Sequence, residues 1–462
     1  MPKHPHLSAT ELARHIDQGA TTSEEFCNDL ANAVDAGSEL NAYTVFDRDL
    51  LMAQAKEADT AKNLGKLRGP LHGVPLILKD NINTAALPTN GGTPALVGND
   101  PGSNAPIAAR LFEAGALLSG KANMHELSSG GTSANHTFGP VRNPYDHARI
   151  PGGSSGGTAA AIAAGLAPAG LGTDTAGSVR VPAALCGIFG FRPSTGRYEA
   201  DGIVPLSKTQ DTAGPLAQTM DDIILLDQIL SQAPRPLPAH TVASLRIGVA
   251  EQLIADSSSA VVSQVISDAL ARLEASGVVL IPVDLSPLRD LQIAAQLGVI
   301  DMEFSGVMGN YLDAFAPHLS IDAVINAVAS PTVKSFTQER LAKAFDPEVY
   351  AQAIGPDLHA YQSAWADLFN QHDLNAIAFP TTPDIALPLA EDDNVLKDDE
   401  VVFSWFYFRH TSMGSVGQRP GISIPAGLSS SGLPVGLELD GLPGKDEDLL
   451  AVAKAVADVI AT

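Results

Sequence analysis

Residues 150–187 read IPGGSSGGTAAAIAAGLAPAGLGTDTAGSVRVPAALCG, and the pattern of this stretch decides the fold that we expect. A turn of small residues, 152–157, runs into the alanine-rich segment 158–165, which favours a helix. The N–H groups of the turn should therefore lie at a helix N-terminus. A second turn, GTDTAGS at 172–178, brings backbone N–H groups together immediately before a serine. Stabilising an oxyanion beside a nucleophile requires this arrangement.

The spacing of two serines is the second feature of this stretch. Ser154 and Ser178 lie 24 positions apart (178 minus 154), and this interval, with both glycine turns in register, resembles the amidase signature family of serine amidases. The resemblance implies that Ser178 is the nucleophile and that Ser154 is a bridging serine, held on a cis peptide bond after Gly153. It also implies that Lys79, in the segment LILKDNI, is the base.

The resemblance extends to the residues around this triad. The segment KANMHELSSGG (121–131) resembles the family loop that borders the amide of the substrate, and residues 190–227 match the arylacetamide branch, the indoleacetamide and mandelamide hydrolases. The implied oxyanion hole consists of the N–H groups around Thr175, Ala176, Gly177 and Ser178. Thr173, Asp174 and Arg180 are implied supports of that loop, the last two as an ion pair, and Ser128, Ser129 and Gly130 are implied substrate-binding residues.

Two simpler interpretations of the first turn compete with this one. A lone GGSSGG segment is usually a plain loop, but a second motif at a fixed spacing and an upstream lysine argue against that here. Residues 152–156 also fit G-x-S-x-G, the nucleophile elbow of α/β-hydrolases. That elbow must follow a buried strand, whereas the lead-in VRNPYDHARIPGG contains two prolines and several charged residues. We therefore reject the elbow.

The composition argues against several classes of partner. Among 462 residues, 28 are basic and 52 acidic, and the net charge of −24 opposes nucleic-acid phosphates and anionic membrane surfaces. Cys27 and Cys186 form no disulfide framework, and no zinc spacing occurs, so we expect a reducing interior. The reaction that the family resemblance implies needs no metal and no cofactor. The N-terminal segment has no apolar region of signal-peptide length, which predicts a cytoplasmic protein. The sequence leaves a homodimer open.

Periodicity predicts the remaining elements. Ser8 and Thr22 have the pattern of helix caps, and a third helix is expected at 47–64. Apolar runs predict buried strands at 74–78, which delivers Lys79 at its end, and at 374–383. A strand, a helix and a second strand are expected between 245 and 283, and a strand pair at 420–439 before a closing helix.

The family resemblance implies an α/β fold with a mixed, mostly parallel central sheet sandwiched by helices. We expect one domain over residues 1–462. Within it, 1–68 would be a helical scaffold, 69–230 the catalytic core, and 231–462 the remaining sheet, helices and substrate pocket. Three prolines, Pro234, Pro236 and Pro238, indicate a connector at the last junction rather than a domain boundary. Five aromatic residues also gather within 403–408, where both a core and a pocket role stay open.

The resemblance implies that the chain hydrolyses a carboxylic amide, aryl or arylacetic, to the acid and ammonia through an acyl-enzyme. Lys79 can accept a proton only as a neutral amine, which burial would favour, and strand alternation should turn Asp80 to the opposite face. Two alternatives share these motifs: the transamidating subunit of a glutaminyl- or asparaginyl-tRNA type amidotransferase, and a non-catalytic amide-binding relative. The arylacetamide-like segment and the negative charge favour an independent hydrolase, and the presence of all three catalytic residue types argues against the non-catalytic relative.

Overall fold

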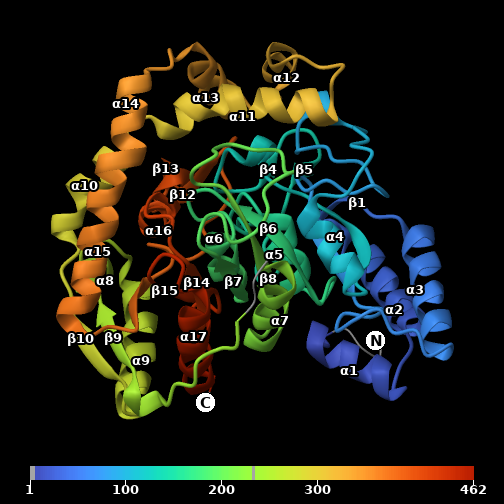
Figure 1. The fold of residues 1–462 in the computed structure, drawn as a ribbon, viewed down its shortest axis with the longest axis horizontal. Coiled ribbons are helices and arrows are strands. Elements are labelled where there is room, and N and C mark those ends of the chain that lie inside the picture. Colours follow the sequence, from blue (N-terminus) through green and yellow to red (C-terminus); the bar gives the residue numbers. More distant parts are fainter. Residues whose placement is uncertain (1–5, 232–234, 462) are drawn as a thin grey trace.

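A sheet of eleven strands forms the centre of the computed structural model, which describes residues 6–231 and 235–461 (Figure 1). Two short strand pairs lie outside this sheet, β4 (Ala134–Asn135) with β5 (Gly139–Pro140) and β12 (Asn394–Lys397) with β13 (Glu400–Phe403). The order of strands across the main sheet is β1 (Tyr43–Val45), β3 (Leu117–Ala122), β2 (Pro75–Lys79), β6 (Ala169–Asp174), β8 (Thr212–Ala217), β7 (Phe189–Arg192), β14 (Gly421–Leu428), β15 (Pro434–Asp440), β11 (Ala376–Pro380), β9 (Arg246–Val249) and β10 (Val279–Pro282).

The sheet is mixed, as expected, but the expectation of a mostly parallel sheet is wrong. Among the strands of the described residues, four neighbouring pairs are parallel: β3 with β2, β2 with β6, β11 with β9, and β9 with β10. The other six pairs are antiparallel. Parallel neighbours need a long crossover, whereas the short turn between β14 and β15 permits only an antiparallel pair. The strands β8, β7, β14 and β15 lie between two groups of parallel strands, one of which carries Lys79.

Helices cover both faces of the sheet. The larger apolar core contains side chains of α1, α3, α4, α7, α9 and α17, and a smaller core packs α5 and α6 against the opposite face. In Figure 1, α11, α12 and α13 lie across the top of the molecule. Among the described residues, none of the helices is long and apolar enough to cross a lipid bilayer. The helices are α1 (Ala9–Gln18), α2 (Ser23–Ala36), α3 (Arg48–Asn63), α4 (Pro106–Glu113), α5 (Gly156–Ala163), α6 (Arg180–Cys186), α7 (Met220–Leu230), α8 (Glu251–Ala255), α9 (Ala260–Ala275), α10 (Arg289–Gln296), α11 (Val299–Phe315), α12 (Ile321–Ala327), α13 (Pro331–Ala342), α14 (Pro347–Gln352), α15 (Leu358–His372), α16 (Ser412–Val416) and α17 (Asp446–Ile460).

Several elements confirm the local sequence signals. Ser8 and Thr22 form capping boxes at the starts of α1 and α2. The expected strand, helix and strand after residue 245 are β9, α9 and β10, and the two strands are parallel neighbours. The late strand pair β14 and β15 precedes the closing helix α17. Pro234 of the expected connector lies outside the described residues, and β1, β2 and β11 bring all three expected sections into one sheet, which supports our proposal of a single domain.

Only part of the second glycine turn is a turn, which corrects the sequence interpretation. Residues 172–174 complete β6, and the chain leaves the sheet at Thr175. The glycines of this strand allow close packing against α5 and β2. A Cβ added to Gly172 would lie 2.6 Å from Oγ of Ser155, just before α5. One added to Gly170 would lie 3.1 Å from Cγ2 of Thr158 in α5 and 2.3 Å from the carbonyl oxygen of Ile77 in β2. The small residues therefore let two loops meet above the sheet.

Candidate active site

Lys79 is the last residue of β2, and its side chain is fully buried. Alternation along the strand puts Ile77 and Lys79 on the face that α5 covers. The Nζ atom of Lys79 lies 2.7 Å from Oγ of Ser154 and 2.8 Å from Oγ1 of Thr173. Among the described residues no carboxylate forms an ion pair with this amine. The lysine is therefore a buried amine surrounded by hydroxyl groups.

Burial governs the protonation of Lys79. The pKa of its amine is lowered to about 7, chiefly because the buried site removes hydration, and the charges of Asp174 and Asp211 offset part of this effect. Asp80 follows directly in the sequence but pairs with Lys121 at 3.5 Å, in agreement with the alternation argument. A substantial fraction of Lys79 is therefore neutral near pH 7 and able to accept a proton.

Ser154 lies between Lys79 and the turn that follows β6. The peptide bond between Gly153 and Ser154 is cis, as the resemblance implied. The carbonyl oxygen of Ser154 accepts the N–H of His125 at 3.1 Å. A Cβ added to Gly153 would lie only 2.9 Å from the carbonyl oxygen of Gly130. These backbone contacts hold the Ser154 hydroxyl next to the amine of Lys79.

Ser178 follows the turn 175–177. Its carbonyl oxygen accepts the N–H of Ser155 at 3.3 Å, which holds the two serine loops side by side. Within the described part of the chain its hydroxyl makes no hydrogen bond, and the residue is 5% exposed. The backbone N–H groups of 175–178 also meet no acceptor among the residues that the structure describes. Free N–H groups beside a free hydroxyl could bind the oxyanion of an attacked carbonyl.

Thr411 supports the turn from behind. Its hydroxyl donates to the carbonyl oxygen of Ala176 at 2.7 Å. Gly177 has a φ of 142°, and a Cβ added there would lie 2.1 Å from Oγ1 of Thr411. Only glycine satisfies both the backbone conformation and this contact. The turn is thus shaped by a residue that lies 235 positions further along the chain.

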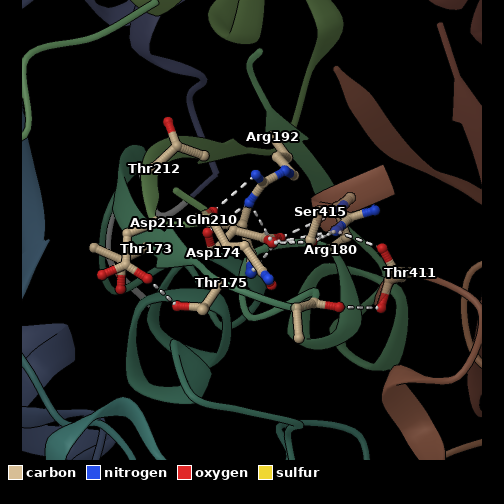
Figure 2. A network of polar contacts seen from close by, with 12 residues as sticks. Thr173, Asp174, Thr175, Arg180, Arg192, Gln210, Asp211, Thr212, Thr411 and Ser415 are labelled. Atoms are coloured by element: carbon tan, nitrogen blue, oxygen red, sulfur yellow. Dashed lines mark hydrogen bonds and ion pairs between the residues drawn. The ribbon is translucent and has the colours of Figure 1, made fainter. Parts of the chain in front are cut away.

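A buried ion-pair network fixes the turn at both ends (Figure 2). Asp174 accepts two hydrogen bonds from Arg180 and one from Arg192, each at 3.1 Å. It also accepts the N–H of Val179 at 3.2 Å, so one carboxylate holds the residues on either side of the turn. Burial alone would raise the pKa of Asp174, but the two guanidinium charges outweigh it and hold the pKa below its usual range. The ion pair expected between Asp174 and Arg180 is present.

The three candidate substrate-binding residues have different surroundings. Ser128 lines a cavity beside the turn. The hydroxyl of Ser129 instead accepts a hydrogen bond from Arg340 at 3.2 Å. Gly130 packs against the ring of His125, where an added Cβ would lie 2.2 Å from Nε2. Of the three, the structure brings only Ser128 to the cavity wall.

This cavity, called the α11 cavity below, has a volume of about 420 Å³. Small-molecule sites commonly enclose roughly 300–1,000 Å³. Thr173, which contacts Lys79, and Thr175, the first residue of the turn, both line the α11 cavity. Its remaining wall comes mainly from residues 200–208 and from α11, with these apolar members: Ala200, Ile203, Val204, Pro205, Leu206, Val307, Tyr311, Ala314 and Phe315. The cavity borders the turn that leads to Ser178, and its apolar wall could receive an apolar group of a substrate.

Sequence reasoning did not single out Asp211. Its Oδ1 atom accepts the hydroxyl of Thr175 at 2.6 Å (Figure 2). Its Oδ2 atom accepts the N–H groups of Leu206 and Ser207 at 2.7 and 2.9 Å. Burial raises the pKa of Asp211, and these hydrogen bonds offset part of the increase. The sequence did place Asp211 within residues 190–227, the segment that resembles the arylacetamide branch, and this was the available signal. No motif marks an acid whose partner lies 36 positions away.

The aromatic cluster at 403–408 divides between core and surface. Tyr407 and Phe408 are buried. Phe403 and Trp405 are 37% and 39% exposed, and their rings stack with an angle of 13° between the planes. No residue of the cluster lines the α11 cavity within the described part of the chain.

The chain is similar to known amide hydrolases along nearly its whole length. The family model described as Amidase matches residues 25–450. The chain is 39% identical to indoleacetamide hydrolase of Agrobacterium vitis over 94% of this chain and 93% of that protein, and 38% identical to mandelamide hydrolase of Pseudomonas putida over 98% and 91%. Among solved structures, the native peptide amidase from Stenotrophomonas maltophilia matches with a TM-score of 0.85 at 27% identity, covering 100% of this chain and 98% of that one.

Proposed function

Because the chain belongs to the amidase family and is therefore a hydrolase of amide C–N bonds, we propose that it converts aryl or arylacetic primary amides to the acid and ammonia. The names of two similar proteins, an indoleacetamide hydrolase and a mandelamide hydrolase, support an aryl acyl group. The apolar wall of the α11 cavity supports it as well. Ammonia needs little space, so the cavity would hold the acyl part of the substrate.

In the proposed acylation step, Oγ of Ser178 attacks the carbonyl carbon of the amide. The proton of Ser178 passes to Oγ of Ser154 while the proton of Ser154 passes to Nζ of Lys79, so the lysine becomes charged. The proton returns by the same path to the amide nitrogen, the C–N bond breaks, and ammonia leaves. Water then attacks the ester on Ser178 while Lys79 again accepts a proton through Ser154. That proton returns to Oγ of Ser178 as the acyl C–O bond breaks, and the acid leaves. The observation that carries this proposal is the 2.7 Å contact between Lys79 and Ser154.

The N–H groups of residues 175–178 are proposed to bind the carbonyl oxygen as it gains negative charge. One such donor typically contributes about 2.7–4 kcal/mol to the stability of the transition state. The contacts of Asp174 and Thr411 with this turn support the assignment, because donors contribute most when they do not have to reorganise during the reaction.

The proposed reaction also has requirements for cofactors, cellular location and oligomeric state. None of its steps uses a metal or a cofactor. We retain a cytoplasmic location and leave the homodimer open. Cys27 and Cys186 are both free and buried, which fits a reducing compartment.

A panel of amides tests the substrate class. Phenylacetamide and indoleacetamide should exceed acetamide in kcat/KM by well over tenfold, because each buried CH₂ group contributes about 0.8 kcal/mol of binding. Ammonia release measures the rate for each amide. A preference for acetamide or for charged amides would refute the aryl assignment. Activity that requires tRNA and a second subunit would instead favour an amidotransferase.

A further inference from the structure

Residues 206–211, with the sequence LSKTQD, connect residues 175–178, which we call the oxyanion turn, to helix α11. We call residues 206–211 the strap. At one end, Asp211 binds the hydroxyl of Thr175, the first residue of the turn, at 2.6 Å. The same carboxylate closes the strap on itself by accepting the N–H groups of Leu206 and Ser207. The carboxylate of Asp211 therefore links the backbone of the strap to the side chain of Thr175.

At its other end the strap is bound by Glu303, a buried residue of α11. The Oε2 atom of Glu303 accepts the hydroxyl of Ser207 at 2.5 Å, and both the N–H and the hydroxyl of Thr209 at 3.2 Å. Its Oε1 atom accepts the hydroxyl of Tyr350 at 2.6 Å. Three of its four hydrogen bonds thus go to the strap. Charge-assisted bonds of this kind are about twice as strong as bonds between neutral groups.

The strap and α11 are also two walls of the same cavity. Leu206 and Asp211 line the α11 cavity from the strap, and Val307 and Tyr311 line it from the helix. A bulky acyl group in this cavity would contact both walls, whereas the methyl group of acetamide is too small to reach across. Contacts made far from the reacting bond can raise kcat when they help to place the groups that bind the transition state.

We propose that Glu303 and Asp211 are positioning residues, which use the strap to couple occupation of the α11 cavity to the placement of the oxyanion turn. The inference rests on the proposed function, because it takes the acyl group of the substrate to occupy that cavity. The preference for large acyl groups over acetamide should then appear partly in kcat and not only in substrate binding. A large acyl group improves the geometry of the turn through α11, Glu303, the strap and Thr175.

The test compares Glu303→Ala and Glu303→Gln on phenylacetamide and acetamide, with kcat and KM determined separately. Glu303→Ala should lower kcat for phenylacetamide by about tenfold to a hundredfold, with little change in KM and less than about a twofold change for acetamide. Glu303→Gln should restore most of the rate, because its carbonyl oxygen can still accept hydrogen bonds from Ser207 and Thr209 while its amide group faces Tyr350. The matched control is Tyr350→Phe, which removes the contact of Glu303 that does not involve the strap and should leave both rates unchanged.

Three results would overturn the inference: equal losses of kcat on both amides, a change in KM alone, or no change. If Glu303→Ala does not fold, Ser207→Ala removes one of the three bonds between Glu303 and the strap, together with the bond that Ser207 accepts from the N–H of Gln210, and should give the same pattern with a smaller loss. The wild-type rates alone test the aryl preference, whereas the ratio of variant to wild type tests the coupling. The proposed function and the coupling can therefore fail independently of each other. If turnover of either amide is too slow to measure, the rates at which a benzyl and a methyl phosphonofluoridate label Ser178 provide the same ratios of variant to wild type.

Discussion

Lys79 and Lys121 are two fully buried lysines near the ends of neighbouring parallel strands, and their partners differ. Lys121 lies opposite Leu78 in the register of β2 and β3, so it occupies the other face of the sheet. Its amine pairs with Asp80 at 3.5 Å and donates to Oγ1 of Thr89 at 2.8 Å. The amine of Lys79 contacts hydroxyl groups and forms no ion pair among the described residues.

This difference in partners distinguishes Lys121, a structural cation, from Lys79, the candidate base. Burial lowers the pKa of both amines, that of Lys79 to about 7 and that of Lys121 to about 8, and Asp80 opposes the effect at Lys121. A proton on Lys121 is held by an adjacent carboxylate. A proton on Lys79 would have no carboxylate in contact, so it can be accepted and returned during a reaction.

The largest expected effect comes from removing the hydroxyl of Ser178, whose proton Lys79 is proposed to accept through Ser154. Ser178→Ala should lose about 10⁵–10⁶ in kcat, the scale of serine nucleophile removal elsewhere, while the protein stays folded. Ammonia release measures the loss, and the thermal midpoint checks the fold. A folded variant with near-normal turnover would show that another group attacks the amide.

Replacing the lysines themselves sharpens the comparison. Lys79→Ala should lose about 10²–10⁴ in kcat/KM, the usual contribution of a general base. Lys79→Arg should not restore the rate, because a guanidinium keeps its proton. An active Lys79→Arg enzyme would place the base elsewhere, and His72 and His125 would be the next candidates.

Lys121→Met is the matched control for these variants. It should keep kcat/KM within about tenfold but lower the free energy of unfolding by about 3–5 kcal/mol, because it leaves Asp80 buried without its cation. Denaturant titration measures the stability. A stable Lys121→Met protein without activity would remove the distinction between the two lysines.

The smallest expected effect concerns the hydroxyls beside the two amines. Thr173→Val removes one acceptor from Lys79 and should lower kcat/KM by about tenfold. Thr89→Val removes the corresponding acceptor from Lys121 and should lower the free energy of unfolding by about 1–3 kcal/mol without changing kcat/KM. Equal effects of both variants on the rate would indicate that the two sites are not functionally distinct.

The sequence predicted what depends on local pattern. Capping residues marked the starts of α1 and α2, and apolar runs marked the buried strands. The spacing of Ser154 and Ser178 indicated two loops that the structure places side by side. Alternation along β2 also separated Lys79 from Asp80, although the two are adjacent in the sequence. Each of these features is set by residues close together in the chain.

The features that sequence reasoning missed depend on distant contacts. The pairing of β7 with β14 joins segments more than 200 residues apart, and no local pattern specifies it. The partner of Asp80 is Lys121 on the next strand, and Thr411 supports Ala176 from the far end of the chain. The glycines of β6 were assigned to a turn because they resemble turn residues, although close packing of α5 explains them.

The pH dependence of Ser178 reactivity tests the central claim, that Lys79 acts as a neutral base, most directly. The rate constant for labelling Ser178 with a serine-directed phosphonate is measured across about pH 5–9, which avoids any limit from product release. Because the protonated amine cannot accept a proton, the rate should rise with pH, bend near pH 7 and then level off, in both the wild type and Lys121→Met. A rate that is independent of pH over this range, or a bend that moves in Lys121→Met, would contradict the claim.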